Sequence, residues 1–281
     1  MAILLDGKKL AQKLKTEIAE KSAEMKTTGI TPTLAVILCG NDPASAVYVR
    51  NKRKDCEECG FDSLEYKLPA DYGEENLLAL VESLNKDPKV HGILVQLPLP
   101  KGYDETRVIH AISPAKDVDA FHPFNVGKIM IGEPGFLPCT PAGVMLLLEE
   151  YHIDPKGKEC LVVGRSNIVG KPMALLLLRK DGTVTIAHSR TQNLADQCRK
   201  ADILVAAVGK AKLITADMVK PGAVVVDVGM NRDENGKLCG DTDFESCEKV
   251  ASHITPVPGG VGPMTRAVLM KNTLQAAVEA K

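Results

Sequence analysis

The segment that most constrains the fold is residues 159–172, which read ECLVVGRSNIVGKP. A short apolar run leads directly into a loop that holds Gly164 and Gly170, and an apolar stretch of helical length follows at residues 173–178. This order of strand, tight turn and helix is typical of the opening unit of a dinucleotide-binding fold, where the free N–H groups and the positive dipole end of the helix meet a pyrophosphate. The segment departs from the usual G-x-G-x-x-G pattern, because Ser166 replaces the middle glycine and the last glycine comes one residue late.

Two other kinds of loop share features with this segment. A phosphate-binding P-loop follows the pattern G-x-x-x-x-G-K-[ST]. Here Gly164 and Gly170 are one residue further apart, and Pro172 follows Lys171, which argues against ATP or GTP chemistry of that kind. An ordinary strand–helix turn without a ligand stays an alternative for the segment alone, because short motifs also occur by chance.

The next expected strand, residues 183–187, ends in His188, Ser189, Arg190 and Thr191. In a typical NAD site an acidic residue at this place binds the ribose hydroxyls. A hydroxyl and a guanidinium suit a 2′-phosphate instead, and no carboxylate is present to repel it. Arg165 in the first turn can add a second cation. The sequence therefore predicts NADP, and not NAD, as the cofactor.

The length and charge of the chain limit its class. It has 281 residues, enough for one large or two ordinary domains, with 35 basic and 36 acidic side chains. Such a balance gives no sign of a surface for nucleic acid or membrane. No apolar run reaches transmembrane length, and the start, MAILLD, lacks the basic leader and the length of a signal peptide. We expect a soluble cytoplasmic protein.

The cysteines are interpreted as free thiols. Eight are scattered along the chain, as expected for a reducing compartment. Cys56 and Cys59 form a single C-x-x-C without a second pair at zinc spacing, and the six histidines form no H-E-x-x-H pattern. Because Cys56 and Cys59 stand in a helical stretch just before Gly60, packing is favoured over a redox or metal role. No metal site is predicted.

Strand-like and helix-like segments alternate along the chain, which predicts an α/β fold with parallel sheets. A first series has expected helices at residues 8–26, 44–59 and 74–85 and expected strands at residues 33–39, 62–68 and 91–97. After a loop-like stretch at residues 132–141, a second series has an expected helix at residues 142–151 and strands at residues 159–163, 183–187, 202–208 and 223–228.

The change of series places a domain division near residue 138. We expect a catalytic α/β domain at residues 1–138 and a Rossmann-like dinucleotide-binding domain with a parallel sheet at residues 139–263. The last helix, residues 264–281, can pack on either domain, and we expect it on the first.

Candidate chemistry in the first domain begins with Ser45, Tyr48 and Lys52, whose spacing places them on one face of a helix. The alternative is a solvated lysine beside a half-buried tyrosine. Gln96 stands near the carboxyl end of a parallel strand, where α/β sheets place their ligand sites. Its alternative is an amide that only hydrogen-bonds to backbone.

Two loops complete the candidates. Asp117 and Asp119 lie in the sequence KDVDAFHP, and Asp119, between apolar neighbours, is expected to point inward. A carboxylate suits a ring with adjacent N–H donors, such as a pterin or guanine edge, whereas a helix cap or turn is the alternative. The loop PVPGGVGPMT at residues 256–265 allows close approach of backbone to a ligand, although it can also be a structural turn.

Together these segments resemble the bifunctional methylenetetrahydrofolate dehydrogenase/methenyltetrahydrofolate cyclohydrolase (FolD) family over nearly the whole chain. Six motifs carry the resemblance, and in order they are Ser45-x-x-Tyr48-x-x-x-Lys52, QLPLP at 96–100, KDVD at 116–119, PCTP at 138–141, G-R-S-x-x-V-G-x-P at 164–172, and residues 256–265. Six ordered motifs are more specific than any one of them. The chain departs at Ala120, where the family usually has Gly, and at Thr242, where Val is usual.

The resemblance implies a role for each candidate. The folate would lie in a cleft between the domains, with Lys52 as the general acid–base of the cyclohydrolase step. Gln96 would orient Lys52, Tyr48 would pack along the folate, and Asp119 would bind the pterin ring. The implied NADP-site residues are Gly164, Arg165, Ser166, Gly170, Ser189 and Arg190. The loop residues implied to close over the substrate are Pro258, Gly259, Gly262 and Pro263.

The implied activity is NADP-dependent oxidation of 5,10-methylenetetrahydrofolate to the 5,10-methenyl compound, followed by hydrolysis to 10-formyltetrahydrofolate. The resemblance also implies a homodimer through the nucleotide domain. Two alternatives stay open at this point. One is a dehydrogenase without cyclohydrolase activity, and the other is a non-catalytic nucleotide-binding module.

Overall fold

The structure is a computed structural model that describes residues 1–280. Lys281, the last residue of the expected C-terminal helix, lies outside the described residues. The chain divides into two compact units. We call Met1–Ala11 with Pro138–Thr265 the six-stranded unit, and Gln12–Leu137 with Arg266–Lys281 the three-stranded unit. The domain limits predicted from the sequence, residues 1–138 and 139–263, remain a prediction alongside these two units.

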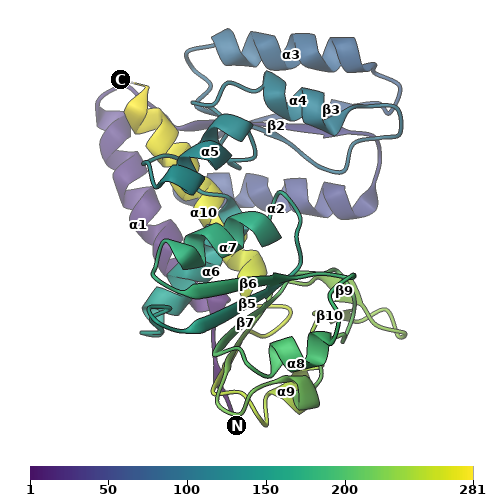
Figure 1. Cartoon of the computed structure of the whole chain (residues 1–281). Coiled ribbons are helices and arrows are strands. Elements are labelled where there is room, and N and C mark those ends of the chain that lie inside the picture. Colours follow the sequence, from purple (N-terminus) through teal and green to yellow (C-terminus); the bar gives the residue numbers. More distant parts are fainter. Residues whose placement is uncertain (281) are drawn as a thin grey trace. The chain divides into compact units, whose positions relative to one another are not determined.

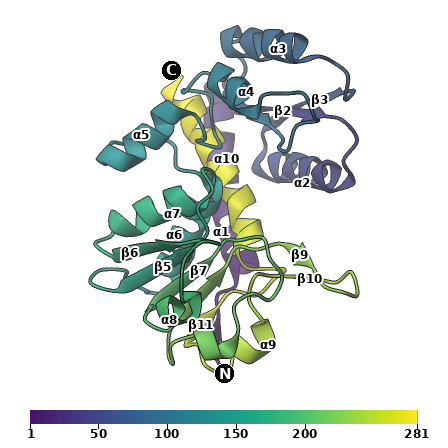
Figure 2. The same ribbon diagram turned by 45° about the vertical axis from the view of Figure 1, so that its right-hand side comes forward.

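The three-stranded unit is built on a parallel sheet with the order β3-β2-β4 (Figure 1). The strands are β2 (Thr33–Cys39), β3 (Asp62–Leu68) and β4 (Gly92–Val95). Every residue of β2 is buried, because this strand is central and covered on both faces. In Figures 1 and 2, α2 (Pro43–Cys59) lies on one face, and α3 (Glu74–Lys86) and α4 (Glu105–Ala111) lie on the other.

Alternation along the strands explains this two-sided core. Ala35, Ile37 and Cys39 of β2 pack with Leu77 and the other buried residues of α3 and with α4. The intervening residues of β2 point to the opposite face, as the strand period of two requires. A further helix, α5 (Pro123–Ile131), follows the loop that contains Asp119.

The six-stranded unit contains a parallel sheet with the order β1-β11-β8-β7-β5-β6. Its strands are β1 (Ile3–Leu4), β5 (Glu159–Val163), β6 (Thr183–Ala187), β7 (Ile203–Ala206), β8 (Val224–Asp227) and β11 (His253–Ile254). The helical segments are α6 (Cys139–Glu150), α7 (Gly170–Leu178), α8 (Leu194–Cys198), η1 (Ala216–Met218) and α9 (Phe244–Cys247). A small antiparallel pair, β9 (Asn231–Arg232) and β10 (Leu238–Cys239), stands apart from this sheet (Figure 2).

Two long helices contribute residues to both units. They are α1 (Gly7–Thr27) and α10 (Val261–Glu279). The later part of α10 belongs to the three-stranded unit, where Asn272 Nδ2 donates to Val118 O at 2.8 Å and to Leu137 O at 2.9 Å. Within residues 1–280, no helix has the length and apolar character needed to cross a membrane.

Several expected boundaries shift, each for a local reason. The expected strand at residues 91–97 is limited to Gly92–Val95, and the peptide bond between Leu97 and Pro98 is cis. Helix α6 begins before Pro141 and α10 before Pro263, since proline is tolerated in a first helical turn where its missing N–H has no partner. The expected loop at residues 256–265 is therefore helical from Val261 onward.

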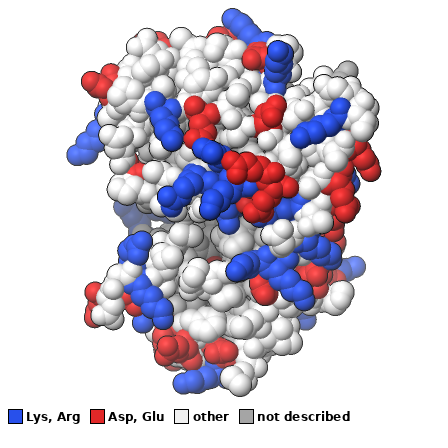
Figure 3. Space-filling model, turned by 180° about the vertical axis from the view of Figure 1, so that it is seen from behind, with Lys and Arg blue, Asp and Glu red and all other residues white. Residues whose placement is uncertain are grey.

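Surface charge is mixed on the face shown in Figure 3. Lys and Arg side chains lie beside Asp and Glu there, so that face carries no continuous area of one sign. This agrees with the nearly equal numbers of basic and acidic residues in the chain.

Candidate active site and nucleotide site

Helix α2 presents the predicted residues Tyr48 and Lys52. Its start is fixed by Asp42, whose Oδ2 accepts from Ser45 N at 2.7 Å, and by a proline at the first helical position. Its end is fixed by Gly60, which adopts the left-handed conformation at φ 70°. Between these caps the helical repeat places Tyr48 and Lys52 on one face, and both side chains are half-buried.

Lys52 and Gln96 meet directly. Lys52 Nζ donates to Gln96 Oε1 at 3.0 Å, while Gln96 Nε2 donates to Leu97 O at 2.7 Å. The backbone of Gln96 continues the sheet beyond β4, since its N–H donates to Ile37 O at 2.9 Å. Both ends of the amide are therefore engaged, and its carbonyl faces the ammonium. An amide carbonyl orients an ammonium without neutralising its charge.

A buried ion-pair network holds α2 in place behind Lys52. Asp55 is 1% exposed and is bound by Arg266 Nη1 at 2.7 Å and by Lys15 Nζ at 3.0 Å. Burial opposes the charge of Lys15, but hydrogen bonds to Glu58 and Asp55 outweigh this and raise its pKa. The network lies one turn beyond Lys52 on α2, and loss of one partner would leave a buried charge uncompensated.

Sequence reasoning missed this network, because Arg266 and Asp55 are 211 positions apart. The one available signal was an arginine within the apolar sequence MTRAVLM, since a charge in an apolar helix face needs a partner.

Arg266 also affects the ionisation of Tyr48 in the candidate site. Burial raises the pKa of Tyr48, and the charge of Arg266 works in the opposite direction. Tyr48 is therefore a neutral phenol at neutral pH.

The two loop aspartates behave differently from the expectation. Asp117, and not Asp119, is the inward carboxylate, at 2% exposure, so this part of the prediction was wrong. Asp117 accepts from Asn125 Nδ2 and His122 N at 2.8 Å each and from Phe121 N at 3.2 Å. These donors compensate for its removal from water, although burial still raises its pKa. Asp119 is half-buried and lies two residues beyond the bridge between Asp117 and Ile93 of β4.

Ala120 keeps a backbone conformation that usually belongs to glycine. It is fully buried with φ 58°, and its N–H donates to Asp117 O at 3.0 Å. A non-glycine residue in this region costs about 1–2 kcal/mol. The loop therefore holds Ala120 in a left-handed turn, the conformation that glycine adopts most readily.

The turn after β5 requires glycine at two places. Gly164 has φ 135°, and a Cβ on it would lie 2.1 Å from Ala207 O. A Cβ on Gly170 would lie 2.3 Å from Gly164 O. Close backbone contacts thus occupy the space of both side chains, which explains the glycine pattern of the sequence.

Ser166 changes how this turn meets the start of α7. Its Oγ accepts from Val169 N at 3.1 Å and from Gly170 N at 3.2 Å. Two N–H groups at the helix start are therefore bound by the serine, whereas the sequence pattern led us to expect them free. Arg165 and Ser166 are both exposed.

The second nucleotide motif lies beside the first. Strands β5 and β6 are neighbours, and Gly164 N donates to Ala187 O, the last residue of β6, at 2.8 Å. Ser189 and Arg190 are exposed in the turn that follows, where Arg190 N donates to His188 Nδ1 at 3.2 Å. The six predicted cofactor residues thus gather at the carboxyl ends of two adjacent parallel strands.

The Gly/Pro segment is anchored to the start of α1. Gly259 has φ 115°, its carbonyl accepts from Lys8 N at 2.9 Å, and the peptide bond before Pro258 is cis. Pro258 is exposed. Gly262 and Pro263 are half-buried and belong to the first turn of α10 instead of the loop.

Sequence reasoning also missed a buried carboxylate pair in the six-stranded unit. Asp227 is 2% exposed and Asp241 is fully buried. Asp227 accepts from Gly229 N, Asp241 N and Thr242 N, and also from Thr242 Oγ1 at 2.6 Å. Burial raises the pKa of Asp227, and these hydrogen bonds oppose the rise. The departure at Thr242 therefore adds a hydroxyl donor to a buried acid.

The cysteine pair is part of the core. Cys56 and Cys59 are fully buried, and burial raises the pKa of each to about 12, so both stay protonated thiols. Cys56 Sγ contacts Met270 Sδ at 3.8 Å. Within residues 1–280, no three or more His, Cys, Asp or Glu side chains are grouped to hold a metal ion.

Comparison with known proteins gives one consistent result. The profile of "Tetrahydrofolate dehydrogenase/cyclohydrolase, catalytic domain" matches residues 5–119, and that of "Tetrahydrofolate dehydrogenase/cyclohydrolase, NAD(P)-binding domain" matches residues 138–281. The bifunctional protein FolD of Acetivibrio thermocellus is 62% identical over 276 residues, which are 98% of this chain and 97% of that protein.

Solved structures agree. The bifunctional FolD enzyme of Campylobacter jejuni has a TM-score of 0.98 and 51% identity, with 99% of each chain covered. The FolD of Trypanosoma brucei, solved with NADP and an inhibitor, has a TM-score of 0.95 and 40% identity, covering 99% of this chain and 98% of that one. Because the matches extend over both units at high identity, the chain belongs to the tetrahydrofolate dehydrogenase/cyclohydrolase family.

Proposed function

We infer that this protein is a bifunctional enzyme of one-carbon metabolism. It oxidises 5,10-methylenetetrahydrofolate with NADP and hydrolyses the 5,10-methenyl product to 10-formyltetrahydrofolate. Family membership and relatives named as bifunctional support this activity. The observation that carries it is the 3.0 Å hydrogen bond from Lys52 Nζ to Gln96 Oε1, because it fixes a proton-carrying group at the carboxyl edge of a parallel sheet.

Lys52 has its main role in the hydrolytic step. Water adds to the methenyl carbon, and the adduct opens to the formyl compound, so protons must leave the water and reach a folate nitrogen. Lys52 Nζ is the proposed carrier of these protons. Gln96 holds the ammonium through its carbonyl, and its own orientation is fixed by the bond from Nε2 to Leu97 O.

Tyr48 and Asp119 are proposed to position the folate. The half-buried Tyr48 offers an aromatic face on the same side of α2 as Lys52, which suits packing against a flat ring. Asp119 is half-buried, so its carboxylate remains able to accept N–H groups of the pterin. We also propose that the substrate contacts Pro258, Gly259, Gly262 and Pro263, of which Pro258 is exposed and the two glycines carry no side chain.

The residues at the β5 and β6 turns fit NADP. Gly164 and Gly170 permit the tight turn between β5 and α7, and such a turn places a helix start beside a pyrophosphate. Ser189 and Arg190, with Arg165, offer exposed hydroxyl and guanidinium groups for a 2′-phosphate. Ser166 Oγ holds the turn before α7 by accepting hydrogen bonds from Val169 N and Gly170 N. When bound, NADP supplies the hydride acceptor for the oxidation.

Assembly, location and domain limits follow from the same observations. We propose a homodimer through the six-stranded unit, supported by the edge strand β6, where Ile186 is 40% exposed. A cytoplasmic location is supported by the eight free cysteines. The division at residue 138 into a folate-binding domain and an NADP-binding domain is supported by the ranges of the two family profiles.

Replacement of Lys52 tests the function directly. We expect Lys52→Met to lower cyclohydrolase turnover by about 10²–10⁴-fold, the usual contribution of a general acid–base, while NADP still binds. Lys54→Met, an exposed lysine of the same helix, is the matched control and should keep both activities. The assay follows reduced cofactor and methenyl absorbance separately, with NADP and with NAD, and confirms the formyl product by chromatography.

Each other outcome has a definite meaning. Full hydrolysis by folded Lys52→Met would remove Lys52 from this role. Lasting methenyl absorbance with the unchanged protein would indicate a dehydrogenase alone. Binding of NADP and folate without turnover would indicate a non-catalytic module, and a preference for NAD would overturn the assignment of Ser189 and Arg190.

A further inference from the structure

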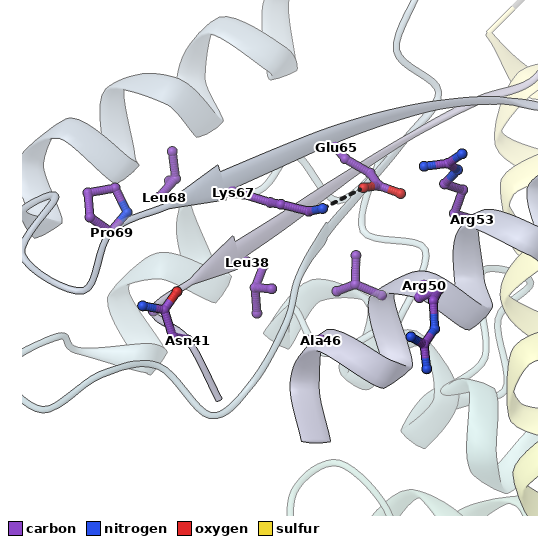
Figure 4. Close-up of a pocket in the computed structure, with 11 residues that line it drawn as sticks. Leu38, Asn41, Ala46, Arg50, Arg53, Glu65, Lys67, Leu68 and Pro69 are labelled. Carbon is purple, nitrogen blue, oxygen red and sulfur yellow. Dashed lines mark ion pairs between the residues drawn. The ribbon is translucent and has the colours of Figure 1, made fainter. Parts of the chain in front are cut away.

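Acidic side chains have different surroundings in the two units. In the three-stranded unit, Glu65 lines a pocket of about 710 Å³ together with Arg50, Arg53 and Lys67 (Figure 4). Lys67 Nζ lies 3.6 Å from Glu65 Oε2 there, and the Lys67 side chain is 72% exposed. In the six-stranded unit, Asp241 is fully buried. Its carboxylate therefore has no access to solvent, and the chain itself supplies its hydrogen bonds.

Asp241 binds the backbone of the loop that follows β7. Its Oδ2 accepts from Val208 N at 2.6 Å and from Gly209 N at 3.1 Å, and its Oδ1 accepts from Lys210 N at 2.9 Å. Oδ1 also accepts from Asn231 Nδ2 at 2.9 Å. Successive N–H groups that converge in this way form a cradle for an anion, and the carboxylate of the chain fills it. Because the three loop residues are exposed, their bonds to Asp241 tie the loop to the core.

Asp241 is itself held by the end of β8. Its N–H donates to Asp227 Oδ1 at 2.9 Å, and Asp227 is the last residue of that strand. A Cβ on Gly229 would lie 2.3 Å from Asp241 Oδ1, so the carboxylate fills the space where another residue would carry its side chain. The position of the loop after β7 is therefore fixed from β8.

The loop after β7 lies where the strand order of the sheet reverses. Strand β5 has β6 on one side and β7 on the other, so the chain changes direction across the sheet at β5 (Figure 1). In doubly wound folds a ligand binds at the carboxyl ends of the strands at such a reversal. Ala207 N donates to Val163 O at 2.8 Å, and a Cβ on Gly164 would lie 2.1 Å from Ala207 O. The loop at residues 208–210 and the turn at Gly164 are therefore neighbours on the two sides of this reversal.

The same strand order separates the two halves of NADP. Ser189 and Arg190, which are proposed for the 2′-phosphate, follow β6, and the pyrophosphate is proposed at the turn after β5. A dinucleotide that extends from β6 across β5 reaches β7 with its nicotinamide half. The loop after β7 is thus on the side of the group that accepts the hydride.

We propose that Asp241 is a positioning residue for hydride transfer, because it holds the loop at residues 208–210 against the nicotinamide half of NADP. Asp241 is fully buried, so it acts through the loop and not by contact with the cofactor. The proposal rests on the proposed function, since it takes NADP as the hydride acceptor.

The first test separates the two halves of the cofactor by calorimetry. Asp241→Asn keeps the size of the side chain but turns one accepting oxygen into an NH₂ group that faces N–H donors. We expect this variant to bind NADP about tenfold more weakly. It should bind 2′,5′-ADP, which lacks the nicotinamide half, as the unchanged protein does. Asp154→Asn is the matched control, since Asp154 is an exposed acid of the same unit that accepts from Lys156 N before β5.

Kinetics provide a second readout. In Asp241→Asn, kcat for oxidation of methylenetetrahydrofolate should fall by about 10- to 100-fold, because a small displacement of the nicotinamide impairs hydride transfer. Hydrolysis of methenyltetrahydrofolate without cofactor should keep its kcat and KM, because Lys52 and Gln96, proposed for that step, belong to the three-stranded unit. A loss that came only from a less stable fold would lower both activities together.

A second variant covers the case in which Asp241→Asn does not fold. Gly209 is exposed with φ 71°, and a Cβ there would meet nothing within 4 Å among the described residues. Gly209→Ala therefore strains the loop without crowding its neighbours, and NADP should bind about three- to tenfold more weakly with 2′,5′-ADP unaffected.

Other outcomes would overturn the proposal. These are unchanged NADP binding by the folded variant, equal weakening of NADP and 2′,5′-ADP, or an equal loss of both activities. If the unchanged protein binds NADP but oxidises no folate, the proposed function fails, and calorimetry alone decides the role of Asp241. Absence of NADP binding by the unchanged protein would overturn both.

Discussion

The Lys52 site and the β5 turn are built in opposite ways. At the turn, backbone fills the space, and a Cβ on Gly164 would lie 2.1 Å from a carbonyl oxygen. Around Lys52, side chains from distant segments contact α2, since Gln96 after β4 is bonded to Lys52 and Arg266 of α10 is bonded to Asp55. The turn after β5 therefore depends on residues without side chains. The Lys52 site depends on neighbouring side chains that hold Lys52 and helix α2 in position.

The largest expected effect would come from filling the backbone site. We expect Gly164→Ala to lower the free energy of unfolding by about 3 kcal/mol or more, because the chain must move away from Ala207 O. Gly127→Ala is the control, since a Cβ there meets nothing within 4 Å and the position is helical. Urea unfolding measures both, and equal stability of the two variants would show that the turn can adjust at no cost.

Removal of support from the side-chain site should have the next effect. Arg266→Leu leaves the buried Asp55 with Lys15 and Glu58 nearby but without its guanidinium, and we expect a loss of about 2–4 kcal/mol. Arg53→Leu removes an exposed pair from the same helix, and no measurable loss is expected. The measurement is again unfolding, together with kcat. A stable Arg266→Leu variant with full activity would show that α2 needs no such anchor.

The smallest expected effect would come from removing the Thr242 hydroxyl, which donates to the buried Asp227. Thr242→Val removes the hydroxyl donor of Asp227, and a loss of about 1.5–3 kcal/mol is expected near neutral pH. Because burial raises the pKa of Asp227, the folded state binds its proton more tightly than the unfolded state does. The free energy of unfolding therefore falls as the pH rises from the pKa of Asp227 in the unfolded state to its higher pKa in the folded state. The variant raises this pKa further, so its loss should be larger at neutral pH than in acid.

Unfolding at the two pH values tests this sign. Thr16→Val, an exposed hydroxyl bonded to Gln12 O, is the control and should show no such dependence on pH. A loss for Thr242→Val that is equal at both pH values would mean that Asp227 stays in one charge state throughout.

Much of the fold could be predicted, because several strands are long or strongly apolar. The strands at residues 33–39, 62–68, 159–163 and 183–187 have the predicted bounds. The two-residue strands β1 and β11 were missed, since such short segments have no period of their own and form only by pairing with the sheet.

The candidate site, like the fold, could be predicted from the sequence only in part. The spacing of Tyr48 and Lys52 predicts a shared helix face, and the glycines predict the turn after β5. Neither spacing nor composition predicts that Arg266 reaches Asp55, or that Asp117 takes three donors and leaves Asp119 nearer to solvent. These contacts depend on tertiary packing, which a local pattern does not contain.

The burial of the thiols has a practical consequence. Seven of the eight cysteines are buried, and Cys239 in β10 is the partly accessible one. A maleimide dye added to the native protein should therefore attach mainly at Cys239. Its fluorescence would then report on the β9–β10 hairpin without any engineered residue, and the remaining thiols would react only as the chain unfolds.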